Sequence, residues 1–195
     1  MCRREKRSTP HARGLYCSAM SVNGFSIGNV ILRSPRMGDE QVIRAAHRAM
    51  AAEDGFDFAL GLEPAMDWKR YLDMLEDYRQ GRNLPDGIIP ATFLIATVND
   101  EIVGRADIRH TLNDHLARRG GHIGYAVLAE HRRRGHGRVI LRQSLDLTHQ
   151  MGIERVLITC DDDNEGSRQI IESCGGTLES VEPWSDGTLI RRYWI

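Results

Sequence analysis

The stretch that decides the fold spans residues 127–137 and reads Val127-Leu128-Ala129-Glu130-His131-Arg132-Arg133-Arg134-Gly135-His136-Gly137. It follows residues 122–128, whose apolar composition is typical of a strand. It leads into residues 137–150, where apolar side chains recur every three or four positions, as in a helix. The sequence therefore predicts a strand, a loop with two glycines and a helix in direct succession.

The loop at residues 132–137 has the composition of a phosphate site. Its glycines permit a sharp turn and a close approach to a ligand, while the helix start offers unpaired N–H groups and the positive end of its dipole. Its arginines add charge-assisted hydrogen bonds that suit a diphosphate. The spacing matches neither a Walker A nor a dinucleotide-binding motif. Taken alone, the loop is equally compatible with a solvated, arginine-rich turn.

The rest of the chain predicts strands and helices in a mixed order. Strands are predicted near residues 31–32, 92–98, 101–110, 156–159, 177–181 and 189–195, and helices at 39–50, 67–81 and 164–174. The strands at 92–98 and 101–110 are expected to form a hairpin with a tight turn at Asn99 and Asp100, and a polar loop is expected through residues 113–121. Asp39, Asp67 and Asn164 are the expected N-caps, because such side chains accept hydrogen bonds from helix N–H groups. The first helix is expected to bury Val42, Ile43, Ala46 and Met50. The order predicts an α/β (α+β) fold, with a mixed, mostly antiparallel twisted sheet of six to seven strands flanked by helices.

Length and charge limit the domain organisation and the partners. The 195 residues suit one domain over residues 29–195, preceded by a polar N-terminal extension at residues 1–28 in which Met20 is an alternative start. The net charge of −1 disfavours nucleic acid and anionic membranes as partners. No apolar run reaches the roughly 20 residues of a membrane span, so a cytoplasmic protein, monomer or homodimer, is expected.

Neither cysteines nor acidic residues predict a metal site. The four cysteines show no C-x-x-C pair, so reduced thiols are expected. Residues 161–172 nearly match a calcium loop, with Gly166 at the sixth position and Glu172 at the twelfth. A calcium loop of this kind requires a preceding helix, whereas residues 156–159 predict a strand. We therefore expect no metal.

The segment from Gly124 to Gly176 resembles the acetyl-CoA-binding half of the GNAT superfamily of N-acetyltransferases. That superfamily has a V-x-P-x-x-R-x-x-G-x-G stretch, which residues 127–137 match with Ala129 in place of the proline. Asn164 stands at the asparagine that opens the family's next helix. Residues 120–125 and 191–195 are similar to a bacterial branch known only as "predicted acetyltransferase". The resemblance covers the C-terminal third well and the N-terminal half by element order alone.

The resemblance implies acetyl-CoA as the co-substrate and assigns its binding residues. Backbone groups near Ala126 and Val127 would pair with the pantetheine arm and polarise the thioester carbonyl. Main-chain amides from Arg133 to Arg138 would hold the diphosphate, and Asn164 would contact the pantetheine. The full expected set is Ala126, Val127, Leu128, Arg132, Arg133, Arg134, Gly135, His136, Gly137, Arg138 and Asn164.

The implied reaction is the transfer of an acetyl group to a primary amine by direct attack in a ternary complex. His122 is the first candidate for the base that removes the amine proton, because its pKa lies near neutrality and an acidic residue stands near this place in several relatives. His110 and Asp107 are the alternatives. The family's usual proton donor, a tyrosine, is replaced by Ile171. Ser167, a water molecule or direct departure of the thiolate would have to serve instead.

Two other functions compete with catalysis. The missing tyrosine favours a non-catalytic acyl-CoA-binding sensor or interaction module on the same fold. Arg132 to Arg134 could instead contact nucleic acid, which the net charge does not support. For a catalytic protein, the acceptor amine is expected between the two N-terminal helices and the hairpin, where four aromatic residues wall a pocket or form plain core: Phe56, Phe58, Trp68 and Tyr71.

Overall fold

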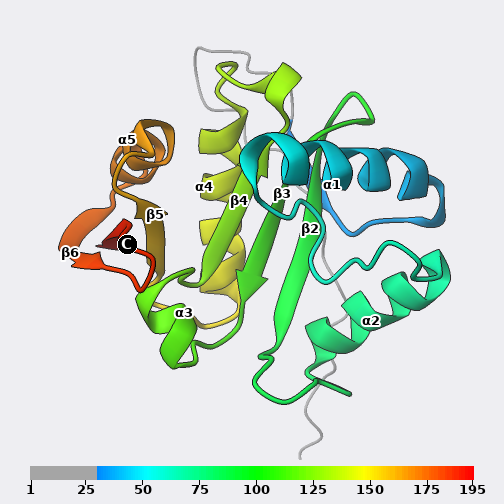
Figure 1. Cartoon of the computed structure of the whole chain (residues 1–195), viewed down its shortest axis with the longest axis horizontal. Coiled ribbons are helices and arrows are strands. Elements are labelled where there is room, and N and C mark those ends of the chain that lie inside the picture. The colour runs from blue at the N-terminus through cyan, green and yellow to red at the C-terminus, as the bar shows by residue number, and fades with distance from the viewer. Residues whose placement is uncertain (1–29) are drawn as a thin grey trace, which may run out of the picture.

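The computed structural model describes residues 30–195, which form two antiparallel sheets with helices around them (Figure 1). In chain order the elements are β1 (Ile31–Arg33), η1 (Met37–Asp39), α1 (Glu40–Asp54), α2 (Trp68–Gln80), β2 (Ala91–Val98), β3 (Glu101–Arg109), α3 (Asp114–Arg118), β4 (Ile123–Val127), η2 (Ala129–His131), α4 (His136–Gln150), β5 (Leu157–Asp161), α5 (Glu165–Ser173), β6 (Thr177–Pro183) and β7 (Leu189–Trp194). The expectations for residues 1–28, including Met20 as the start, lie outside the described residues.

The strands confirm the predicted α/β class and divide into two groups. The larger sheet has the order β1-β2-β3-β4 and the smaller one β5-β7-β6, with antiparallel pairing throughout. The predicted β2–β3 hairpin is present. Its turn residues, Asn99 and Asp100, have positive φ angles of 50° and 66°, the conformation that matches the twist of the flanking strands.

Backbone and side-chain hydrogen bonds join the two sheets between the residue before β4 and the first residue of β5. The His122 N–H donates to the Leu157 carbonyl at 2.7 Å, and the Leu157 N–H donates to His122 Nδ1 at 2.9 Å. Gly121 adopts φ +63°, and a Cβ atom there would stand 2.4 Å from the Leu157 oxygen, so this approach requires glycine. Beyond this junction no strand ladder joins β4 to β5, because they belong to different sheets.

Helices cover both faces of the larger sheet. In Figure 1, α1 crosses in front of the strands and α4 lies behind them. On the α1 and α2 face the core contains Ile43, Tyr71 and Phe93, and on the α4 face Ile140 packs with Ala106. None of the helices within residues 30–195 is both long enough and apolar enough to cross a membrane.

Two local expectations were wrong. Val42 does not join the buried face of α1, since 50% of it is exposed, whereas Ile43, Ala46 and Met50 are buried. Residues 114–118, expected as part of a polar loop, form the short helix α3. The Asn113 side chain caps this helix by accepting from the Leu116 N–H at 2.9 Å. A helix of five residues is too short to show an apolar period.

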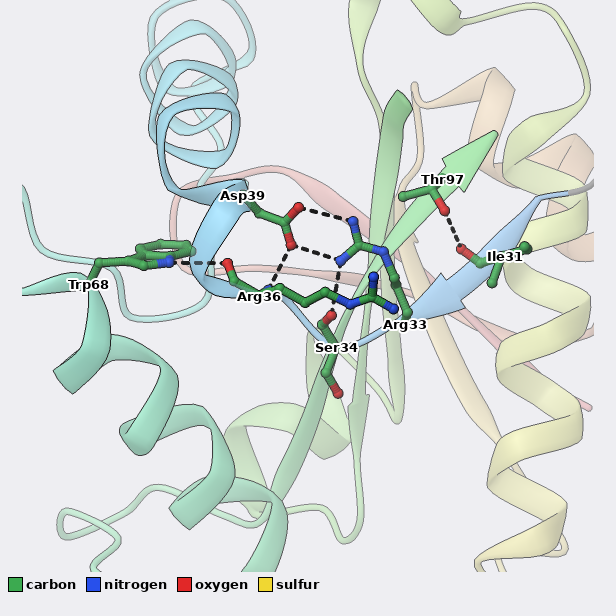
Figure 2. A network of polar contacts seen from close by, with 7 residues as sticks. All are labelled: Ile31, Arg33, Ser34, Arg36, Asp39, Trp68 and Thr97. Atoms are coloured by element: carbon green, nitrogen blue, oxygen red, sulfur yellow. Dashed lines mark hydrogen bonds and ion pairs between the residues drawn. The ribbon is translucent and has the colours of Figure 1, made fainter. Parts of the chain in front are cut away.

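An ion pair joins β1 to the start of α1 (Figure 2). The Arg33 guanidinium donates to both carboxylate oxygens of Asp39, at 2.7 and 2.9 Å, and the Arg36 N–H donates to the same carboxylate at 2.7 Å. The Arg36 carbonyl in turn accepts from the Trp68 indole at 3.2 Å, which ties in α2. The hydrogen bonds from Arg33 lower the pKa of Asp39 from its usual value.

Replacement of this carboxylate is expected to destabilise the protein in a pH-dependent way. Asp39→Asn should cost about 1–3 kcal/mol at pH 7, since it removes charge-assisted hydrogen bonds from a shielded position. Because the pKa of Asp39 is lowered on folding, its contribution is present above the ordinary carboxyl pKa of about 4 and is lost as the pH falls through the lower, folded-state pKa.

Urea unfolding of the wild type and of Asp39→Asn at pH 7 and near pH 3 measures the loss of stability and its dependence on pH. Asp73→Asn, which breaks the exposed ion pair with Lys69, is the matched control and should change stability far less. Equal losses in the two variants, or a loss that does not depend on pH, would contradict the assignment.

Candidate active site

A cleft of ≈ 940 Å³ opens between β4 and β5, where the two sheets separate. Residues of β4, the loop after it, the start of α4 and the start of α5 line most of its wall. Phe56 and the side chain of Arg109 line the cleft as well. The predicted strand, glycine loop and helix therefore border one large concave site.

The edge of β4 that faces the cleft has unpaired backbone groups. The Arg109 N–H donates to the His122 carbonyl at 2.8 Å and the Leu128 N–H donates to the Val103 carbonyl at 3.0 Å. Bonded positions alternate along an antiparallel pair, so even-numbered residues of this strand face β3. The odd-numbered residues direct their N–H and C=O groups toward the cleft: Ile123, Tyr125 and Val127.

This phase changes part of the expected cofactor set. The backbone N–H and C=O groups of Ala126 face β3, as do those of Leu128, although Ala126 itself lines the cleft. Val127 has the predicted orientation, although its carbonyl already accepts from Arg132 Nε at 3.1 Å. Tyr125, which we did not predict, supplies the neighbouring edge N–H. The sequence carries this signal only through the period of two along a strand, and the phase itself requires the partner strand.

The loop after β4 turns through two left-handed residues. Arg133 has φ 63° and Gly135, the N-cap of α4, has φ 81°. Gly137 follows in the first turn of α4, where a Cβ atom would stand 2.9 Å from Ile170 Cδ1. Glycine at this position lets α4 approach α5 closely, so the N–H groups at the start of α4 border the cleft.

The three arginines of the loop have different surroundings. The Arg132 guanidinium binds Asp54 at the end of α1, with one N–O distance of 3.3 Å, so its charge is already paired. Arg133 and Arg138 line the cleft, whereas Arg134 does not. The His136 side chain is buried, which leaves its backbone as the group that can reach a ligand.

The start of α5 forms the opposite wall. Asn164 lines the cleft and caps α5 by accepting from the Ser167 N–H at 2.9 Å. The Tyr125 hydroxyl reaches across from β4 toward the Ser167 carbonyl at 3.5 Å, and burial raises the pKa of this phenol well above its usual value. Ile171 is fully buried in the core formed with β5 and β7.

Comparison with known protein families decides the assignment. The model of the Acetyltransferase (GNAT) family matches residues 62–175, more than half of the chain. The chain belongs to the GNAT family. It is therefore an acyltransferase. No curated protein matches its sequence.

Solved GNAT structures share this fold at low sequence identity. RimJ of Mycobacterium smegmatis, solved with CoA-disulfide, is similar with a TM-score of 0.63 and 20% identity over 87% of this chain and 82% of its own. The ribosomal-protein-alanine N-acetyltransferase of Brucella melitensis gives a TM-score of 0.59 and 15% identity, covering 85% and 98%. The microcin C7 self-immunity acetyltransferase MccE, solved with acetyl-CoA and AMP, gives 0.58 and 17%, covering 88% and 95%.

The base candidates of this GNAT protein lie in three different environments. His122 is buried and is not part of the cleft wall. Its Nδ1 lone pair accepts the Leu157 N–H, and burial, followed by the charge of Arg109, lowers its pKa. His122 cannot take a proton on Nδ1 without giving up that hydrogen bond. Its catalytic role stays a prediction, and the geometry favours a structural one.

The two alternative bases have different surroundings, and neither lines the cleft. His110 Nε2 lies 2.8 Å from Thr92 Oγ1, at the end of β3 and outside the cleft wall. Asp107 is buried and pairs with Arg109 at 2.9 Å, and it is the register partner of Gly124, which lines the cleft. One oxygen of Asp107 has no hydrogen-bond partner within residues 30–195. Asp107 does not line the cleft either, but its strand partner Gly124 does.

The aromatic residues expected around the acceptor mostly form core. Phe58, Trp68 and Tyr71 are buried and belong to the cluster between α1, α2 and the sheet. Phe56 is 43% exposed and lines the cleft, so it is the one member of this group that a bound molecule can reach.

The structure also shows the surroundings of the calcium-like stretch at residues 161–172. β5 is a strand and leads directly into α5, so the calcium-like stretch at residues 161–172 lacks the helix that should precede it. Asp161 pairs with Arg119 at 3.0 Å and Asp162 with Arg191 at 2.6 Å. Within the described chain, no group of three His, Cys, Asp or Glu residues is placed to hold a metal ion.

Substitution of His122 is expected to separate a structural role from a catalytic one. His122→Ala leaves the buried Leu157 N–H without an acceptor and should cost about 1–3 kcal/mol in urea unfolding at pH 8. His122→Asn places an oxygen near the position of Nδ1 and should retain most of the stability.

The pH dependence provides an internal check. Because the pKa of His122 is lowered on folding, the unfolded state binds more protons as the pH falls below about 6.5, so the wild type should lose stability relative to the asparagine variant between pH 8 and pH 5.5. If His122→Ala kept its stability and lost only acetyl transfer, His122 would be the base.

Proposed function

We propose that this GNAT acyltransferase moves the acetyl group of acetyl-CoA to a primary amine by direct attack, with both substrates bound together in the cleft. The observation that carries the proposal is the free edge of β4 beside the glycine loop that opens α4. This arrangement offers a strand edge to an amide-containing arm and a helix start to a diphosphate.

Acetyl-CoA would lie between β4 and α5. The amides from Arg133 to Arg138 would hold the diphosphate, with the Arg133 and Arg138 side chains adding charge. The edge groups of Val127 and the side chain of Asn164 would bind the pantetheine arm. MccE is solved with acetyl-CoA, which supports this ligand for the shared fold.

The reaction requires orientation, deprotonation and charge stabilisation. The amine nitrogen attacks the thioester carbonyl carbon, the new C–N bond forms, and the C–S bond breaks with its electron pair leaving on sulfur. The Tyr125 N–H at the β4 edge would stabilise the oxyanion. Asp107 would accept the amine proton through a water molecule, since its own oxygen is buried.

The hydroxyl of Tyr125 can also donate a proton to the departing thiolate. Position 171, where the resemblance places a tyrosine, holds a buried isoleucine. The Tyr125 hydroxyl reaches the same helix from the opposite wall of the cleft, and its raised pKa keeps it protonated at neutral pH. We assign Tyr125 as the proton donor to the departing thiolate.

Tyr125→Phe should therefore lower kcat about 10-fold or more, while acetyl-CoA affinity changes little. Steady-state kinetics and calorimetric titration with CoA measure the two quantities. Ser167→Ala tests the other candidate donor and should leave kcat nearly unchanged, because the Tyr125 hydroxyl contacts the Ser167 carbonyl and not its side chain. An unchanged kcat in Tyr125→Phe would show that the thiolate leaves without this donor.

Diphosphate binding is tested on the face of α4. Arg138→Gln, at a cleft residue, should weaken acetyl-CoA binding about 10-fold and reduce its dependence on salt. Arg142→Gln removes the same charge one turn later, at an exposed position outside the cleft, and should leave the affinity unchanged. Equal effects in both variants would argue for long-range charge alone.

Release of free thiol from acetyl-CoA in the presence of an amine panel tests the function itself. An acyltransferase releases thiol in step with amine consumption. The alternative, an acyl-CoA sensor, binds acetyl-CoA in the calorimeter and releases no thiol above the rate without amine.

A further inference from the structure

One face of β3 carries three charged side chains in succession. This face lies beside the part of the cleft lined by Phe56, Arg109 and Gly124, which we call its acceptor end. Residues 105, 107 and 109 share this face because side chains alternate along a strand. They are Arg105, Asp107 and Arg109, and Arg105 and Asp107 are buried. Asp107 pairs with Arg109 at 2.9 Å, so one of the two guanidinium charges is balanced.

Arg105 is the uncompensated charge. It is 5% exposed, it forms no ion pair within residues 30–195, and its Nε has no hydrogen-bond partner there. Its guanidinium lies 4.8 Å from the ring centre of Phe56 and donates weakly to the Asp57 carbonyl at 3.4 Å. Burial lowers the pKa of Arg105 to about 10, which still leaves it charged at neutral pH. A buried, unpaired cation is costly unless an anion arrives to balance it.

Gly124 separates this charge from the cleft. A Cβ atom at Gly124 would stand 3.2 Å from Arg109 Nη2 and 3.3 Å from Arg105 Nη1. A side chain at position 124 would lie against both guanidinium groups, whereas glycine leaves the space beside them open. Gly124, Arg109 and Phe56 all line the cleft, so a ligand at its acceptor end lies directly over the pair.

We propose that Arg105 and Arg109 bind a carboxylate of the acceptor through the opening at Gly124, so that the preferred acceptors are amines that carry a carboxylate near the amino group. This inference rests on the proposed acetyl transfer and names the chemical class of its second substrate. A free amino acid and a peptide with an acidic second residue both supply such a group. The competing explanation is ordered water that bridges Arg105, Asp107 and the Tyr71 hydroxyl, which has no hydrogen-bond partner within residues 30–195.

The test compares matched acceptors in the thiol-release assay. The panel contains free L-amino acids, the corresponding carboxamides, and short peptides with aspartate or asparagine at the second position. The wild type should prefer the carboxylate member of at least one pair by about 10- to 100-fold in kcat/KM, as expected for hydrogen bonds to a charged group. The pair that shows this preference identifies the source of the carboxylate.

Arg105→Met keeps the apolar stem and removes the unpaired charge, so it is not expected to unfold the protein. It should raise KM for the preferred acceptor about 10- to 100-fold. KM for the matched amide and for acetyl-CoA should change by less than about twofold. Arg142→Met, which removes a charge from the exposed face of α4, is the control and should change none of them.

A second variant keeps both arginines. Gly124→Ala places a methyl group over the guanidinium nitrogens and should weaken the carboxylate acceptor selectively, with the amide again little affected. If the wild type shows no preference within any pair, or if both variants affect acid and amide equally, the carboxylate site is refuted and acetyl transfer stands.

If no amine releases thiol, the CoA-saturated protein is titrated calorimetrically with the same pairs. Tighter binding of the acid than of the amide, lost in Arg105→Met, would support the anion site and refute transfer. Equal binding of acid and amide would overturn the site as well.

Discussion

The site depends on a single junction between two sheets. The His122 backbone and ring each make one hydrogen bond to Leu157, and Gly121 lets the two segments approach closely enough for both. Beyond this point β4 and β5 belong to separate sheets and do not pair with each other. The cleft opens between them for this reason. Backbone groups left unpaired at a sheet edge would be costly in a closed core. Here they face an open cleft, where a ligand or water can satisfy them.

The two walls of the cleft have complementary tasks. The wall formed by α4 and α5 presents helix starts and a left-handed loop, which suit phosphates without requiring every nearby arginine. Arg132 is an example, because its side chain donates to the Val127 carbonyl and to Asp54 and so connects the loop to the end of α1. The wall beneath Gly124 instead carries charged side chains from β3 that core packing does not need. In the proposed complex, the cofactor would therefore be held mainly by backbone groups, and the acceptor by side chains.

Local signals in the sequence predicted most elements of the fold, including the strand, glycine loop and helix start that border the cleft. Helix caps such as Asp67 and Asn164, and the turn at Asn99 and Asp100, depend on residues a few positions apart and were correctly placed. The environment of His122 could not be predicted in this way, because it depends on a partner 35 residues away in the sequence. The phase of the β4 edge was missed for the same reason.

The arrangement at β3 shows why a near-neutral protein can hold a strongly charged site. The net charge of −1 is a sum over the whole chain, and half of the arginines within residues 30–195 form an ion pair with a carboxylate. Arg105 is buried under Phe56, where the low dielectric strengthens any interaction with an anion that approaches. At the surface, water would solvate the same guanidinium, and the proposed preference for acceptors with a carboxylate would be lost. A glycine on the neighbouring strand is the feature that makes this buried charge accessible, so position 124 bears on specificity although it contributes no functional group.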